Sequence, residues 1–171
     1  VSAQTPDYEG EFVTDLTGRL SGPEKVKISR TLRQAASSSH IHTMVVLIET
    51  LDEYPEMPQT IDGFATKLAN DWKIGSFSSK KGILILFSLT DRKLFIAKTS
   101  NLPQSLTDGV KNKMGMVFKN LKEKNFSRAM SLTATVVYES VPALAKKASS
   151  GPVKTTTKTT KTRRYNNSYG S

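Results

Sequence analysis

The clearest pattern of apolar and polar positions in the chain lies in residues 82–99. Five consecutive apolar residues, Ile83–Phe87, precede a polar turn, Ser88–Arg92, and residues 94–97 then alternate between an inward and an outward position. An unbroken apolar run is typical of a strand covered on both faces, whereas alternation is typical of a strand with one more open face. The pattern therefore predicts a β-hairpin at the centre of a sheet, with Asp91 near its tip.

Helical spacing of apolar residues surrounds this hairpin. Helices are expected over residues 22–36, 60–72, 105–121 and 126–147. Ser21 and Glu24 have the spacing of a capping box at the first helix, and Ser105 and Asp108 repeat it at the third. Pro142 predicts a kink or a break in the last helix. Strands that alternate with helices are typical of a layered α/β domain.

An apolar strand is expected over residues 40–49, with its most apolar part at Thr43–Ile48. The first helix should pack on the core through a stripe that includes Val26 and Ile28. His40 and His42 are two residues apart, which on a strand places both on one face and suggests a metal pair. No third ligand accompanies them, so two polar residues at the start of a strand are the favoured interpretation.

Charge divides the chain into a nearly neutral body and a basic end. Seven of the 25 basic residues lie in residues 146–171, which contain no acid, so 18 remain elsewhere against 15 acidic residues. We predict a flexible arm over 1–11, one folded domain over 12–147 and a disordered Thr- and Lys-rich tail over 148–171. A basic tail is more typical of a solvated linker or tether than of a folded nucleic-acid surface, so nucleic acid is an unlikely partner.

The chain contains no cysteine, which excludes disulfides and thiol catalysis but leaves the compartment open. No apolar run is long enough to span a bilayer. Two glycosylation sequons begin at Asn125 and Asn166, and the N-terminal sequence is compatible with a mature end after removal of a signal. These features permit an extracellular, lumenal or periplasmic location, with a membrane anchor beyond the chain end as an expectation.

Several short motifs occur in the order found in a known family. They are Val13-Thr-Asp15 with Leu20-Ser21, TMVVLIET, Asp71-Trp72-Lys-Ile-Gly75, Lys81-Gly82-Ile-Leu-Ile-Leu, Asp91-Arg92 and Leu106-Thr-Asp108-Gly109. In these motifs the sequence resembles the TPM domain family, which includes thylakoid-lumen photosystem repair proteins with reported acid phosphatase activity, bacterial envelope proteins and a branch related to an animal levamisole-receptor modulator. The similarity spans about residues 12–144. It implies an α/β fold, specifically a three-layer α/β/α sandwich with the hairpin 82–99 in its central sheet.

The sequence departs from the family pattern at two places. Members usually carry an acidic residue or Asn just before the glycine of the central strand, and a glycine-rich turn after the second hairpin strand. The residues that replace them, and that we expect to form an altered binding site, are Lys80, Lys81, Ser100 and Asn101. Ammonium groups repel a cation, and side chains in place of glycine obstruct the approach of a backbone to a phosphate. The altered site should therefore hold cations and phosphate poorly.

The resemblance leaves three acidic candidates, Asp15, Asp91 and Asp108. In a phosphatase they would hold a divalent ion that polarises phosphate and activates water. Each also has an ordinary structural use, since aspartates begin turns, occupy hairpin loops and cap helices. The structural use is the favoured interpretation, and we expect no cofactor, or only weakly bound Ca²⁺ or Mg²⁺.

Three functions remain in competition. The first is a non-catalytic TPM-like interaction module outside the cytoplasm, an accessory or modulator of a membrane protein or membrane-associated assembly. The second is a metal-assisted acid phosphatase that acts on phosphomonoesters through the three aspartates. The third, a nucleic-acid-binding protein, would depend on the tail and lacks a groove-reading or stacking motif.

Overall fold

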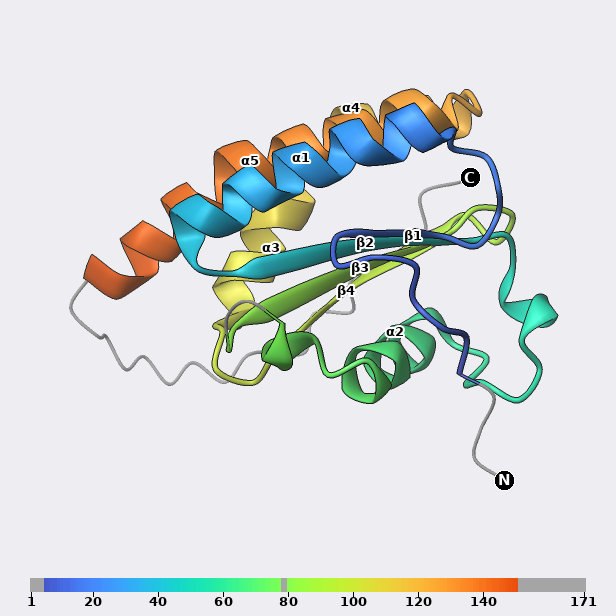
Figure 1. Ribbon diagram of the computed structural model, residues 1–171, viewed down its shortest axis with the longest axis horizontal. Helices are drawn as coiled ribbons and strands as arrows, with labels where there is room; N and C mark the ends of the chain where they lie inside the picture. Colours follow the sequence, from blue (N-terminus) through green and yellow to red (C-terminus); the bar gives the residue numbers. More distant parts are fainter. Residues whose placement is uncertain (1–4, 78–79, 151–171) are drawn as a thin grey trace.

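The computed structural model describes residues 5–77 and 80–150 (Figure 1). In chain order its strands are β1 (Val13–Asp15), β2 (His42–Ile48), β3 (Gly82–Ser88) and β4 (Lys93–Lys98). Its α-helices are α1 (Gly22–Ser39), α2 (Ile61–Asp71), α3 (Gln104–Asn112), α4 (Gly115–Lys122) and α5 (Phe126–Ser150). Two short 3₁₀ turns, η1 (Leu51–Glu53) and η2 (Ile74–Ser76), complete the described elements.

The four strands form one sheet in the order β1-β2-β3-β4. β1, β2 and β3 are parallel, and β4 returns antiparallel to β3 through the predicted hairpin. The register places His42 beside Gly82 at one end of the central strands and Ile48 beside Ser88 at the other. The sheet therefore has an amino edge, where β2 and β3 begin, and a carboxyl edge, where they end.

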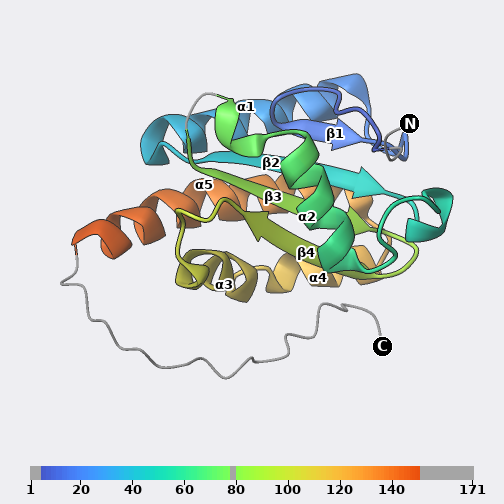
Figure 2. The same ribbon diagram turned by 90° about the horizontal axis from the view of Figure 1, so that it is seen from below.

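Helices cover both faces of this sheet, which confirms the three-layer α/β/α sandwich. α1, α3, α4 and α5 lie on one face and α2 lies on the other (Figures 1 and 2). Alternate residues of β2 and β3 divide between the two cores: Val45 and Ile85 pack toward the four helices, whereas Val46 and Leu86 pack toward α2. The unbroken apolar runs of the central strands are thus explained by burial on both faces.

β4 is more covered than its alternation suggests. Phe95 and Ala97 were expected to face outward, but both pack with the α2 core, and Ala97 is buried. The predicted buried stripe of the first helix was also wrong in one residue, because Val26 is 58% exposed. At 100° per residue Val26 lies about 200° from Ile28, the first buried residue of the stripe, so the two side chains point in nearly opposite directions.

The C-terminal helices differ from the prediction. The expected third helix is two helices, because Lys113 and Met114 close α3 with i→i−3 hydrogen bonds to Val110 and Lys111 and the Met114 side chain enters the core. α5 continues through Pro142 without a break. Of the predicted kink or break, the break does not occur, and Tyr138, whose carbonyl Pro142 cannot bond, lies on the exposed face of α5.

The histidines and the N-terminal segment also have defined places. His40 caps α1 in a left-handed conformation and is exposed, whereas His42 is buried in β2, so the two do not share a strand face.

Within the predicted arm, the Trp72 indole N–H donates to the Pro6 carbonyl at 2.8 Å, and Tyr8 packs edge-on against Trp72. The predicted tail, 148–171, lies largely outside the described residues. No described helix is long and apolar enough to cross a membrane.

Candidate functional site

The topology places the three aspartates at opposite edges of the sheet. Asp15 ends β1 and Asp91 lies in the β3–β4 hairpin, so both belong to the carboxyl edge. Asp108 lies in α3, which follows β4, and the last residue of β4, Lys98, pairs with Ile83 near the amino edge. The structure therefore does not bring Asp108 together with the other two.

Asp15 is buried and closes the loop that joins β1 to α1. Its Oδ1 accepts hydrogen bonds from the backbone N–H of Thr17, at 2.9 Å, and from the Thr17 hydroxyl, and its Oδ2 accepts from the N–H of Leu20 at 2.8 Å. Such an arrangement satisfies backbone donors that the turn would otherwise leave buried and unpaired. The Asp15 carboxylate thus holds the entry to α1.

Asp91 joins the hairpin to the loop after β2. Its Oδ2 accepts from the Leu51 N–H at 2.8 Å and from the Ser88 hydroxyl at 2.7 Å, and the Thr50 hydroxyl lies 3.2 Å from both oxygens. Partial burial raises the pKa of Asp91, but the hydrogen bonds from Leu51, Ser88 and Thr50 outweigh it, and the pKa is lowered overall. The carboxylate is therefore ionised and engaged at neutral pH.

Asp108 is not the capping-box residue predicted at the start of α3. The helix begins one residue earlier than Ser105, at Gln104, and its N-cap is Pro103, which has no side-chain cap. Asp108 instead accepts from the Gln104 side-chain amide at 3.0 Å. In the described part of the chain, no three His, Cys, Asp or Glu side chains are grouped as a metal site.

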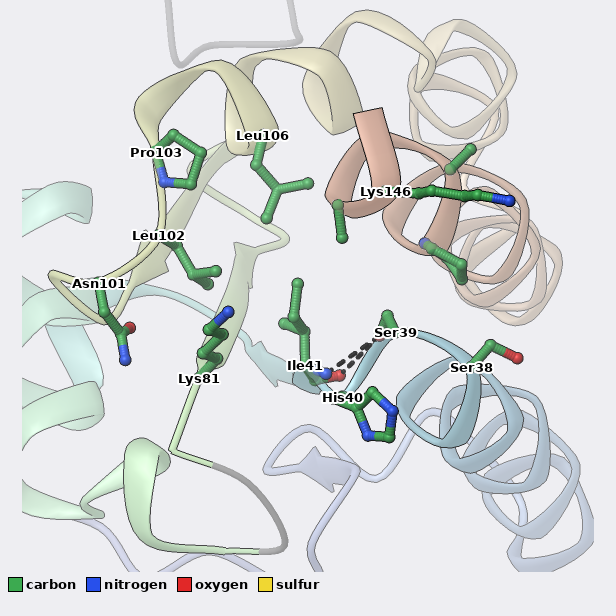
Figure 3. A pocket seen from close by; sticks show the side chains of 13 residues that line it. Ser38, Ser39, His40, Ile41, Lys81, Asn101, Leu102, Pro103, Leu106 and Lys146 are labelled. Carbon is green, nitrogen blue, oxygen red and sulfur yellow. Dashed lines mark hydrogen bonds between the residues drawn. The ribbon is translucent and has the colours of Figure 1, made fainter. Parts of the chain in front are cut away.

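A pocket of about 670 Å³ lies at the amino edge (Figure 3). The end of α1, the start of β3, the β4–α3 connection and the last turns of α5 surround it. Its lining residues are Ser38, Ser39, His40, Ile41, Lys81, Asn101, Leu102, Pro103, Leu106, Pro142, Ala143, Ala145 and Lys146. Its volume falls in the range of small-molecule and cofactor sites. We call it the amino-edge pocket.

Two of the four predicted binding residues line the amino-edge pocket and two do not. Lys81 and Asn101 reach it from two neighbouring segments, and the Lys81 side chain points in the direction of Leu102 (Figure 3). Lys80 and Ser100 are exposed beside the pocket and are not part of its lining. The neighbouring lysines thus differ in their relation to the pocket, a difference that the sequence pattern did not indicate.

The wall that carries Lys81 and Asn101 is fixed by hydrogen bonds between the two segments. The Asn101 amide donates to the Lys80 carbonyl at 3.1 Å, and the Thr99 hydroxyl accepts from the Gly82 N–H at 3.1 Å and donates to the Asn101 amide oxygen at 2.6 Å. Gly82 is required here because a Cβ atom would lie 2.7 Å from the carbonyl oxygen of Ile74. The Thr-Ser-Asn turn therefore has a structural role in place of the glycines of the family pattern.

The lining of the amino-edge pocket is largely apolar and contains basic groups but no carboxylate. Lys81, Lys146 and His40 are its titratable residues, and in Figure 3 the Lys146 side chain extends outward from α5. Hard divalent cations prefer several oxygen ligands that include carboxylates, and an ammonium group repels them. The donor set of this pocket therefore does not fit Ca²⁺ or Mg²⁺, and it suits an anionic or amphipathic group instead.

Sequence reasoning missed most of the pocket lining. His40 was expected at the start of a strand and instead caps α1, Leu106 lies in a helix beside which no pocket was expected, and Pro142 was expected to kink or break the last helix.

Comparison with known proteins supports the fold. No curated protein matches the sequence significantly. Among solved structures, the chain is similar to the N-terminal domain of the cg2496 protein of Corynebacterium glutamicum, with a TM-score of 0.59 and 17% identity over 90% of this chain and 91% of that one. An N-terminal domain from P. gingivalis is similar with a TM-score of 0.61 and 20% identity, over 80% of this chain and 85% of that one. The BA42 protein of Bizionia argentinensis is similar with a TM-score of 0.58 and 15% identity, over 75% of this chain and 85% of that one.

The sequence itself matches the TPM domain over residues 13–139, a range that begins at β1 and ends within α5. The match includes the sheet and the hairpin, and it ends before the α5 residues that line the amino-edge pocket, which begin at Pro142. The chain therefore belongs to the TPM domain family.

Proposed function

We propose that this protein is a non-catalytic interaction module that acts outside the cytoplasm as an accessory or modulator of a membrane protein or membrane-associated assembly. Its partner would insert an apolar segment that carries an acidic group into the amino-edge pocket. The observation that carries the proposal is the lining of this pocket, in which Lys81 stands where the family pattern has an acidic residue or Asn.

The chemistry of the pocket supports a protein partner of this kind. Ile41, Leu102 and Leu106 supply an apolar surface, which favours association by burial of apolar groups. Lys81 supplies a positive charge, and electrostatic complementarity mainly determines specificity. Neither contribution requires a metal or a reaction step.

An extracellular or lumenal location is proposed from the sequons. Asn125 is exposed in the connection between α4 and α5, where an attached glycan would project from the surface. Asn166 lies outside the described residues. Mass spectrometry of the protein from its native source tests whether either asparagine is modified.

Neighbouring lysines provide a matched test of the binding proposal. The Lys81→Asp protein and the Lys80→Asp protein differ from the wild type by the same charge, but only position 81 lines the pocket. After photo-crosslinking to solubilised native membranes, wild type and Lys80→Asp should yield the same membrane-protein adduct. Lys81→Asp should reduce that adduct by about tenfold, because an acidic partner group would be repelled. Equal adduct yields from the two variants, or no adduct from the wild type, would refute the proposal.

The alternative is a divalent-metal-assisted acid phosphatase that uses Asp15, Asp91 and Asp108. It predicts hydrolysis of a generic phosphomonoester at acid or neutral pH that rises with Ca²⁺ or Mg²⁺ and falls on substitution of Asp15 or Asp91. The same protein preparations serve for this assay. Metal-dependent turnover that these substitutions abolish would replace the interaction proposal.

A further inference from the structure

A second pocket, of about 700 Å³, lies near the carboxyl edge, where α1 and α5 begin side by side (Figure 1). Its lining residues are Arg19, Lys27, Lys124, Asn125, Phe126, Ser127, Arg128 and Ser131. Four of these eight side chains are cationic and none is acidic. They come from the β1–α1 loop, from α1, from the α4–α5 connection and from α5. We call this site the basic pocket.

The cations of the basic pocket are only partly balanced by neighbouring acids. Arg19 pairs with Glu49, Nη2 to Oε2 at 2.7 Å, and its guanidinium lies 4.7 Å from the centre of the Phe126 ring. Lys27, Lys124 and Arg128 form no salt bridge with any residue in the described ranges. Three cations therefore converge on one pocket with no ionic partner among the described residues.

The carboxylates near the basic pocket bond residues of its lining but are not themselves part of that lining. Glu24 accepts from the hydroxyl of Ser127 and from the backbone N–H of Ser21, and these bonds lower the pKa of Glu24. Glu49 is held by Arg19 and accepts from the Thr90 hydroxyl at 3.2 Å. Neither carboxylate lines the pocket, so the surface offered to a ligand carries a net positive charge.

We propose that the basic pocket binds a compact ligand that carries several sulfate or phosphate ester groups. Cations that face one another from different elements repel, and a multiply charged anion between them removes that repulsion. Guanidinium, ammonium, hydroxyl and amide groups also donate from several directions, and the oxygens of a tetrahedral oxyanion accept from several directions. The site is separate from the amino-edge pocket, so it does not depend on the proposed function.

Isothermal titration of the full chain tests the proposal, with sucrose octasulfate and inositol hexakisphosphate as probes. The protein should be produced without glycosylation, because Asn125 lines the pocket and a glycan attached to it would hinder access of the probe. The Lys27→Gln/Arg128→Gln variant removes two pocket charges. The Lys113→Gln/Lys119→Gln variant removes two exposed charges outside the pocket and keeps the basic tail, so it is the matched control.

At least one probe should bind the wild type and the control with the same affinity, and should bind the pocket variant about tenfold or more weakly. Amide NMR signals of residues 124–128 should shift on binding. Comparison of inositol hexasulfate with inositol hexakisphosphate, which share a scaffold and a number of esters, would distinguish sulfate from phosphate. Equal loss in both variants, shifts confined to residues 148–171, or equally tight pocket binding of a hexaglutamate peptide would overturn the proposal.

Discussion

Replacement of Asp91 tests whether its carboxylate has a structural role or a catalytic role. In the structure this side chain joins the hairpin to the loop after β2, through Leu51, Ser88 and Thr50. If the carboxylate serves the fold, Asp91→Ala must destabilise the protein. If it serves a reaction, stability should be unchanged or higher, because catalytic groups are commonly held at a cost in stability.

The size of the destabilisation follows from the hydrogen-bond donors that lose their acceptor when Asp91 is replaced. A hydrogen bond to a charged group contributes about 1.5–3 kcal/mol, and a neutral one about 1. Asp91→Ala leaves the Leu51 N–H unpaired, while the Ser88 and Thr50 hydroxyls can rotate to other acceptors. Because Asp91 is only partly buried, water recovers some of the loss, and we expect about 2–3 kcal/mol of destabilisation. Asp91→Asn keeps one oxygen acceptor and should cost about 1 kcal/mol.

Urea and thermal unfolding measure this series, with Asp52→Asn as the control because Asp52 is an exposed acid in the neighbouring loop. For a domain of this size, Asp91→Ala should lower Tm by about 4–12 °C, and Asp52→Asn should change stability by less than about 0.5 kcal/mol. The hydrogen bonds lower the pKa of Asp91 below its ordinary value of 3.8, so its contribution is complete above that pH and declines as the pH falls through the lower folded value. The difference from wild type should therefore shrink in acid. An Asp91→Ala protein as stable as the wild type at pH 7 would refute the structural role.

Two further predictions concern the same sheet. Gly82→Ala should lower the free energy of unfolding by about 1–3 kcal/mol, because the new Cβ would lie 2.7 Å from the Ile74 carbonyl oxygen. Gly115→Ala is the control, because its Cβ would have no atom within 4 Å, and urea unfolding should show it to be neutral or stabilising. Burial lowers the pKa of His42 below 6.5, so the unfolded chain takes up a proton more readily and stability should decrease as the pH falls through about 6.5. Tm between pH 7.5 and 5.5 should show this decrease in wild type and His40→Asn but much less of it in His42→Phe.

The fold was predictable where local chemistry and burial agree. The capping box of Ser21 and Glu24 forms as expected, and Thr60 caps α2. The hairpin was predictable because its apolar run and polar turn are adjacent in the sequence. The division of the third helix was not predicted, although Gly115 is a local signal for a helix end, because the division also depends on the insertion of Met114 into a core formed by distant residues.

The candidate site was predictable in position but not in composition. Lys81 and Asn101 were named because they interrupt a family pattern, and the structure places both at the amino-edge pocket. Lys80 carries the same charge one position earlier, but it is exposed and does not line the pocket, a difference that the fold determines. The basic pocket was not expected, because Lys27 and Lys124 are far apart in the chain and meet only through the packing of α1 beside α5.

The two edges of the sheet differ in how their polar groups are used, and this difference bears on the choice between the proposed functions. At the carboxyl edge, Asp15 and Asp91 each accept three donors, and a carboxylate offers only about four lone-pair sites. Coordination of a metal by Asp15 would therefore compete with the N–H groups that hold the entry to α1. At the amino edge, Lys81 is an exposed lining residue of the pocket, and the backbone hydrogen bond that its carbonyl accepts from the N–H of His42 does not involve its side chain. Metal binding at the carboxyl edge would thus compete with backbone hydrogen bonds that a contact to the Lys81 side chain leaves in place.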